Sequence, residues 1–136
     1  MAAKTYRGSC HCGAIPFEAE LDLANGTHKC NCSNCTKARS WFAPTAVDKV
    51  KLLQGAENQT EYTWIPPGKA ASYLQFRFCK TCGVRTFGES VDHKFAFVNV
   101  AALDDVDRDE LAAAPQKFAD GRHDKFNESP ADTRFL

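Results

Sequence analysis

Seven cysteines, gathered in three clusters, constrain this 136-residue chain more than any other feature. The clusters are two doublets and one triplet: Cys10-His11-Cys12, Cys79-Lys80-Thr81-Cys82 and Cys30-Asn31-Cys32-Ser33-Asn34-Cys35. An odd number of thiols cannot pair completely into disulfides, and closely spaced thiols converge readily on one metal ion. The clusters therefore predict metal ligands or redox groups ahead of disulfides.

The ligand number of zinc suggests how the clusters divide, because zinc prefers four ligands in a tetrahedron. The economical partition joins both doublets in one closed structural site, made of Cys10, Cys12, Cys79 and Cys82. The remaining triplet, Cys30, Cys32 and Cys35, leaves one coordination position open, which is the usual composition of a catalytic zinc site. Spacing alone does not fix this partition, since two members of the triplet could also close a site with either doublet.

The triplet allows two further interpretations. A histidine could complete it as a purely structural site, and His28, just before the first thiol, is a better candidate than His11. The triplet could also hold no metal and act as a redox group, since Cys32-Ser33-Asn34-Cys35 is a C-x-x-C sequence. Both alternatives stay open at the level of the sequence.

Composition narrows the class of protein. The chain is 43% hydrophobic with ten Phe, enough for a core, and its length suits one domain over residues 1–136. A net charge of zero argues against nucleic-acid binding, which depends on Lys and Arg neutralising phosphates. No run approaches the roughly 20 apolar residues of a membrane span, and the N-terminus lacks the apolar core of a signal peptide. We therefore expect a cytoplasmic protein with no membrane partner, whose thiols stay reduced.

The periodic signal is mostly that of strands. Alternating or short apolar runs predict strands at residues 14–21, 50–53, 61–65, 72–78 and 95–100. The run at 72–78 divides into two faces, one with Leu74, Phe76 and Phe78 and the other with Tyr73, Gln75 and Arg77.

One helix signal is clear. Asp107 can cap a helix over residues 108–114, with Glu110 completing a capping box and Pro115 ending the helix. A further helical turn is expected after Cys35. The chain therefore predicts a mainly β domain with one or two short helices.

A set of motifs follows one another along nearly the whole chain: Gly8–Ala14, His28–Cys35, Leu52–Gly55 with Tyr62, Arg77–Gly83 and Val98–Asp105. This ordered set resembles the glutathione-dependent formaldehyde-activating enzyme / centromere protein V family. The resemblance implies a β-tent, a set of small coiled antiparallel sheets held by zinc. It also implies the partition above, with a structural zinc in the joined doublets and an active-site zinc in the triplet.

The resemblance further implies an enzyme. The reaction of the family's named member condenses glutathione with formaldehyde to S-(hydroxymethyl)glutathione, formally a carbon-sulfur lyase reaction run in reverse. A thiol bound to zinc loses its proton, so Cys30, Cys32 and Cys35 are the expected catalytic residues. Lewis-acid activation of the aldehyde is the less favoured route, because three thiolates already give the site a negative charge.

Other functions are compatible with the same residues. The electrophile could be a relative of formaldehyde, since a shared fold and metal site do not fix the chemistry. The centromere member of the family suggests a non-enzymatic zinc module for a protein or nucleic-acid partner. A redox or zinc-handling role for the triplet is the third hypothesis. The oligomeric state is not predicted.

The substrate that the resemblance implies is an anion, which predicts cationic side chains in its pocket. Glutathione has two carboxylates, so its pocket needs cationic or amide partners. The arginines that could supply them are Arg39, Arg77, Arg85 and Arg122. The sequence does not say which of them converge, and most arginines of any protein lie on the solvated surface.

Two aromatic residues and a polar motif are further candidates for substrate binding. Trp41 and Phe42 follow the triplet and could wall a pocket, although aromatic residues more often belong to the core. In the polar motif at residues 120–124, Arg122 and His123 could contact the substrate, with an exposed turn as the alternative.

Overall fold

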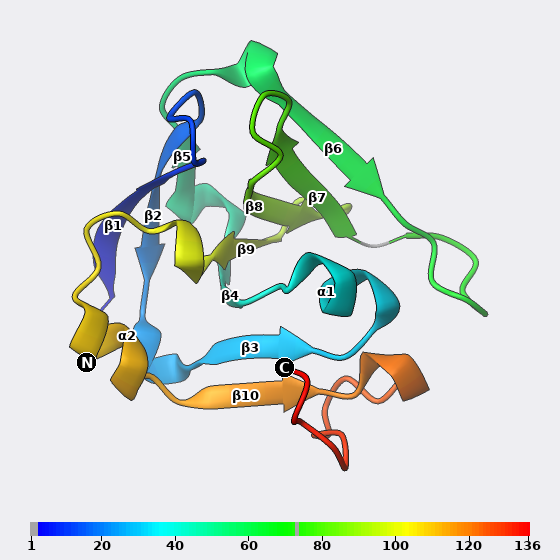
Figure 1. Ribbon diagram of the computed structural model, residues 1–136. Helices are drawn as coiled ribbons and strands as arrows, with labels where there is room; N and C mark the ends of the chain where they lie inside the picture. Colours follow the sequence, from blue (N-terminus) through cyan, green and yellow to red (C-terminus); the bar gives the residue numbers. More distant parts are fainter. Residues whose placement is uncertain (1–2, 73) are drawn as a thin grey trace.

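The computed structural model of the protein describes residues 3–72 and 74–136 and is built mainly of β-strands (Figure 1). The smaller of two sheets has three antiparallel strands in the order β1-β2-β5. These strands are β1 (Lys4–Ser9), β2 (Pro16–Leu21) and β5 (Val50–Leu52).

The larger sheet has seven strands in the order β10-β3-β4-β9-β8-β7-β6. In chain order they are β3 (Thr27–Cys30), β4 (Phe42–Ala46), β6 (Gln59–Thr63), β7 (Leu74–Cys79), β8 (Arg85–Ser90), β9 (Phe95–Asn99) and β10 (Gln116–Ala119). Neighbours in this sheet are antiparallel, except that β10 runs parallel to β3. The mainly β class expected from the sequence is therefore confirmed.

Two short α-helices, α1 (Ser33–Ala38) and α2 (Arg108–Ala113), complete the regular structure together with short 3-10 turns. The turns are Leu23–Asn25, Val47–Lys49, Ala56–Asn58, Val100–Ala102 and Gly121–His123. Helix α1 includes Cys35 instead of following it, because the Cys32 thiol caps the helix by accepting from the Cys35 N–H. Within the described residues, no helix combines the length and the apolar character that a bilayer span requires.

The cap of α2 is partly as predicted. Asp107 accepts hydrogen bonds from the backbone N–H groups of Asp109 and Glu110. Glu110 does not complete a capping box, since its carboxylate instead accepts a 2.6 Å hydrogen bond from the Tyr6 hydroxyl. That bond ties α2 to β1 in the smaller sheet.

The five predicted strands correspond to β2, β5, β6, β7 and β9, with ends shifted by one or two residues. The run predicted at 61–65 is displaced most, because β6 begins at Gln59 and leaves Trp64 and Ile65 in the following connection. In β7 the pairing shifts between Phe76 and Phe78, so the simple alternation does not hold along the whole strand. Tyr73, assigned to the second face of this run, lies outside the described residues.

The main core lies between the two sheets. Phe17 and Leu21 of β2 are fully buried with Val98 of β9, and the rings of Phe17 and Phe87 are 5.5 Å apart. Burial of such a side chain contributes roughly 1.5–3 kcal/mol. Gly8 of β1 makes room for the ring of Phe17, its cross-strand partner in β2, because a Cβ at this position would overlap that ring. One face of the larger sheet is thus used for the core, which leaves its other face for the site.

Candidate metal centres and the adjoining cavity

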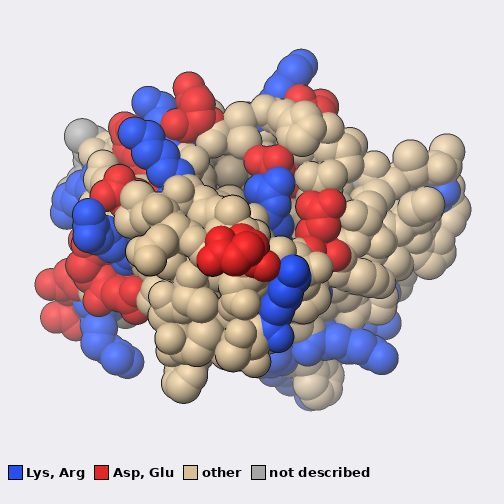
Figure 2. All heavy atoms as spheres, turned by 90° about the horizontal axis from the view of Figure 1, so that it is seen from above, with Lys and Arg blue, Asp and Glu red and all other residues tan. Residues whose placement is uncertain are grey.

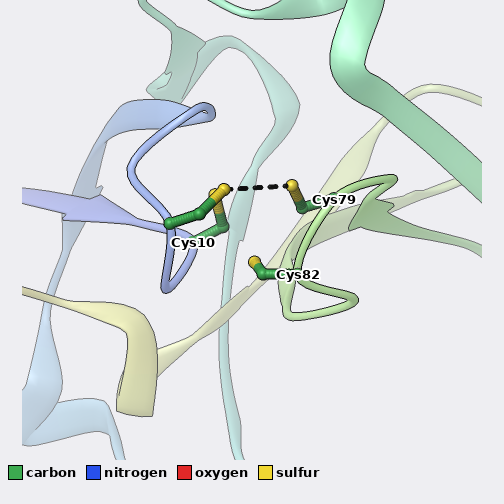
Figure 3. A group of neighbouring side chains, drawn as sticks. Cys10, Cys79 and Cys82 are labelled. Atoms are coloured by element: carbon green, nitrogen blue, oxygen red, sulfur yellow. Dashed lines mark hydrogen bonds between the residues drawn. The ribbon is translucent and has the colours of Figure 1, made fainter.

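The two cysteine doublets form one group, which we call the four-cysteine group. The sulfur atoms of Cys10, Cys12, Cys79 and Cys82 all lie within 4.8 Å of one another. Figure 3 shows Cys10 on one loop and Cys79 and Cys82 on a facing loop, with their side chains directed toward each other. The sulfurs of Cys12 and Cys79 are 3.6 Å apart, although the two residues are separated by 67 positions.

Tight glycine turns shape both loops of this group. Gly13 and Gly83 each follow a doublet with positive φ, at 83° and 77°, where a glycine avoids the strain of a side chain. Their N–H groups bond back to the carbonyls of Cys10 and Cys79, which closes each loop. Both doublets therefore fold into the same kind of turn and present their thiols to one point.

The donor chemistry of the four-cysteine group fits a closed metal site. The Cys79 sulfur accepts from the Asn58 amide at 3.1 Å and from the Thr81 N–H at 3.3 Å. The pKa of Cys79 is lowered to about 6, first by the backbone N–H of Cys82 and then by that of Thr81. Hydrogen bonds that favour the thiolate prepare the sulfur for a cation. Four convergent thiolates form the ligand set of a structural zinc.

The triplet forms a second group with a different position in the fold. Cys30 ends β3, Cys32 caps α1 and Cys35 lies in its first turn, so a strand-to-helix junction brings the three sulfurs within 4.8 Å of one another. All three residues are buried. The N–H groups of Cys32 and Cys35 donate to the sulfurs of Cys30 and Cys32 at 3.4 and 3.3 Å.

Hydrogen bonds among the three thiols of the triplet give them different pKa values. The Cys32 and Cys35 thiols donate to the Cys30 sulfur and lower the pKa of Cys30 to about 3. The same contacts raise the pKa values of Cys32 and Cys35. Cys30 is therefore the thiol that ionises most readily, and the three sulfurs offer a donor set that suits a soft or borderline cation such as zinc.

Neither histidine joins the triplet. Among the described residues the group contains only the three cysteines. His28 stacks on Phe42 with ring centroids 5.7 Å apart, and burial lowers its pKa. His11 is exposed, as its place between two ligands suggests. The triplet thus keeps the incomplete, three-thiol composition that distinguishes it from the four-cysteine group.

A cavity of about 620 Å³ lies beside the triplet, and all three cysteines line it. Trp41, Phe42 and Arg122, which the sequence marks as substrate contacts, also line the cavity. His123 does not: its ring is turned to Asp120, at 2.9 Å, and its side chain is mostly exposed. The cavity falls within the size range of small-molecule sites.

All four candidate arginines converge on this cavity, which the sequence could not indicate: Arg39, Arg77, Arg85 and Arg122. Arg77 is already neutralised by the carboxylates of Glu89, at 2.8 Å, and Glu61, at 3.8 Å. The other three donate to neutral oxygens of Phe135, Asn34 and Asn31 within the described chain. Their charges are therefore available to an anionic ligand.

Arg85 is the most unusual of the three available arginines. It lies over the Phe76 ring at 4.8 Å and donates to Asn34 at 3.0 Å, yet its Nη1 is buried with no hydrogen-bond partner among the described residues. Burial lowers the pKa of Arg85, while the nearby charges of Cys35 and Cys32 raise it. Its guanidinium thus joins the triplet to the aromatic side of the cavity.

The polar motif at residues 120–124 closes over the triplet through Asn31. Asn31 donates to the Asp120 carboxylate at 2.8 Å and accepts from the Arg122 N–H at 2.9 Å. A Cβ on Gly121 would lie 2.5 Å from the Cys30 sulfur, so the absence of a side chain allows this approach. Sequence reasoning noted the motif but missed Asn31 as its partner, although its position between two ligands was a usable signal.

The comparison with known families is decisive for family membership. The model of the family described as "Glutathione-dependent formaldehyde-activating enzyme" matches residues 5–120. The chain belongs to this family. Among named members of the family, a protein of Phaeosphaeria nodorum that bears the name of a glutathione-dependent formaldehyde-activating enzyme is 33% identical over 102 residues. The match covers 70% of this chain and 52% of that relative, so the chain spans about half of its length.

A solved structure shows the same fold. The crystal structure of a Rhodobacter sphaeroides protein superposes on this member of the family with a TM-score of 0.66 and 31% sequence identity. The superposition covers 81% of this chain and 98% of the Rhodobacter sphaeroides chain.

Proposed function

We propose that the protein is a zinc-dependent enzyme of the carbon-sulfur lyase type, which condenses glutathione with formaldehyde or a related electrophile. The observation that carries this proposal is the incomplete three-thiol group at a cavity with three arginines that pair with no carboxylate among the described residues. The family match and the name of the Phaeosphaeria nodorum relative support the same reaction.

The two cysteine groups have separate roles in this proposal. The four-cysteine group would hold a structural zinc, with all four ligand positions supplied by the protein. The triplet would hold a second zinc, whose chemistry is to keep a bound thiol deprotonated at neutral pH. Such thiol chemistry requires reduced cysteines, and all seven are free in the structure. The proposal includes a cytoplasmic location, where thiols stay reduced, and a single domain over residues 1–136.

The residues around the triplet would bind and orient the substrate. Arg39, Arg85 and Arg122 would pair with the two carboxylates of glutathione, in charge-assisted hydrogen bonds. Trp41 and Phe42 would wall the reacting sulfur from bulk water. Holding both reactants in one cavity supplies the proximity on which such an addition depends.

The non-enzymatic alternative receives less support. On the face shown in Figure 2, basic and acidic side chains are both spread over the surface, which does not provide the basic patch of a nucleic-acid site. A cavity with convergent charged groups is also the usual form of a small-molecule site.

The proposal is tested by NMR exchange between formaldehyde plus glutathione and their adduct. The zinc-replete protein is expected to accelerate this exchange above its uncatalysed rate. Cys32→Ser is expected to lose the acceleration and one of two zincs per chain while it stays folded. Lys37→Ala, an exposed position of α1 that does not line the cavity, is the control and should behave as the wild type.

Two results would contradict the proposal in different ways. Full acceleration by Cys32→Ser would remove the triplet from the mechanism. No acceleration by a wild-type protein that holds two zincs would exclude the formaldehyde reaction.

A further inference from the structure

The face of the larger sheet that lines the cavity carries three neighbouring aromatic rings, those of Phe42, Phe76 and Phe97, which we call the aromatic floor. Phe76 of β7 pairs with Gly88 of β8, and Gly88 pairs with Phe97 of β9, so these three residues lie side by side across the sheet. A Cβ on Gly88 would lie 2.5 Å from the Phe97 ring. The glycine therefore lets the two flanking rings approach to 5.6 Å, with Phe42 a further 5.8 Å from Phe97.

This floor lies on the opposite face of the sheet from the main core. Val98, the neighbour of Phe97, is fully buried in the core, whereas Phe97 itself and Phe42 are only half-buried and line the cavity. Trp64 and Pro66, from the connection after β6, add apolar surface to another wall. The rings of Phe42 and Phe97 are thus available to a ligand, whereas Phe76 is only 8% exposed and lies beneath Arg85.

The floor begins next to the reacting thiols. Arg85 lies over the Phe76 ring at 4.8 Å and is close enough to Cys35 and Cys32 to experience their charge. Trp64 packs directly against the triplet. A group attached to a sulfur at the triplet would therefore extend over the rings.

Formaldehyde cannot use this surface. It has two heavy atoms and occupies roughly 60 Å³, about the volume of two waters, in a cavity of about 620 Å³. The polar backbone of glutathione does not suit the rings either, since its carboxylates and ammonium would lose water without gaining a partner there. The rings require an apolar ligand group of their own size.

Building on the proposed function, we infer that the electrophile is an aldehyde bearing an aromatic or comparably large apolar group. The glutathione sulfur forms a bond to the carbonyl carbon, the carbonyl π bond breaks, and the thiol proton ends on the carbonyl oxygen. The product is a hemithioacetal, and neither an oxidant nor a reductant is needed. The apolar group of the aldehyde lies against the rings of Phe97 and Phe42, while the arginines hold the carboxylates.

The inference is tested by calorimetric binding of two stable thioethers, S-methylglutathione and S-benzylglutathione, to the zinc-replete full chain. S-Benzylglutathione is expected to bind at least about tenfold more tightly, because only its ring covers the floor. In Phe97→Leu this preference should fall to less than about threefold, with S-methylglutathione binding unchanged. Phe95→Leu is the matched control, since Phe95 lies on the same strand, is 60% exposed and does not line the cavity.

The outcomes separate this inference from the proposed function. Equal affinity for the two thioethers, together with accelerated formaldehyde exchange, would overturn the aromatic substrate and leave the enzyme intact. Equal weakening of both thioethers by Phe97→Leu would show that the ring is only structural, which also overturns the inference. Failure of both thioethers to bind a protein that holds two zincs would overturn both proposals.

Discussion

At the scale of single residues, Arg85 connects the two chemistries of the cavity. Its Nη2 is held by Asn34, its plane lies over Phe76, and its buried Nη1 has no partner within the described chain. A buried donor without a partner is costly, and an anionic ligand would supply the missing acceptor. Arg77 is the contrasting case, because Glu89 and Glu61 already neutralise it.

We predict that Arg85→Met weakens the binding of S-methylglutathione by about tenfold or more, since hydrogen bonds to charged groups contribute roughly 1.5–3 kcal/mol. Arg85→Lys should restore part of the affinity, because it returns the charge without the second donor. Calorimetric titration measures both variants, with zinc content as a check on the triplet. Arg108→Met, on the exposed face of α2, is the control. Unchanged affinity in Arg85→Met would remove this residue from the ligand site.

At the scale of elements, the sequence predicted the strands with a clean apolar alternation and missed those without it. β2 was found because Phe17, Ala19 and Leu21 point into the core at every second position. β8 was missed because its cavity face carries Gly88, so no alternation is visible. β3 and β10 are only four residues long, and their pairing depends on a parallel contact between distant segments. β7 and β9 also line the cavity but were found, because each keeps apolar residues at alternate positions along at least part of its length.

The sequence likewise predicted only part of the candidate site. The grouping of the doublets and of the triplet followed from ligand number and spacing, and the structure places the sulfurs accordingly. The convergence of the four arginines depends on the strand order β9-β8-β7 and on the return of the tail beside β3. Neither property has a local sequence signal, since both are set by tertiary packing.

The ion pair between Arg77 of β7 and Glu89 of β8 also predicts that the free energy of unfolding depends on pH. Burial opposes ionisation of Glu89, yet its hydrogen bond to Arg77 keeps its pKa below the ordinary value of 4.5. A carboxyl with a depressed pKa stabilises the fold above its ordinary pKa, and this stability is lost as the pH falls through the folded value. We predict that Glu89→Gln lowers the free energy of unfolding by about 1 kcal/mol at pH 7 and by progressively less below pH 4.5.

Urea unfolding of the wild type and of Glu89→Gln between pH 3 and pH 7 measures this difference. Glu57→Gln, at an exposed position of the turn before β6, is the control and should not change the pH dependence. A constant difference over the whole pH range would show that the ion pair is not its source.

At the scale of the whole molecule, the four-cysteine group joins the two sheets. Cys10 and Cys12 follow β1 of the smaller sheet, while Cys79 ends β7 of the larger one. The triplet makes no such connection, since its members lie in one short segment from the end of β3 to the first turn of α1. The two groups therefore differ in what their loss would do to the fold.

We predict that Cys10→Ser destabilises the zinc-replete protein by about 3 kcal/mol or more, because structural zinc contributes folding free energy on the order of 10 kcal/mol. Cys35→Ser should lose one zinc and the exchange activity at a much smaller cost in stability. Thermal unfolding by circular dichroism, with zinc measured per chain, compares the two. Equal destabilisation by both substitutions would show that the triplet is also a structural site.

The separation of the thiols from the aromatic floor has a consequence for how such proteins diverge. The sulfurs lie on β3 and α1, whereas Phe76, Gly88 and Phe97 lie on three other strands. Substitutions on those strands can change the shape and polarity of the floor without displacing a cysteine of the triplet. Under the function proposed above, one lineage could therefore exchange one aldehyde for another while it inherits the same way of activating a thiol. The fold then acts as a reusable scaffold, in which selectivity evolves at positions that leave the chemistry untouched.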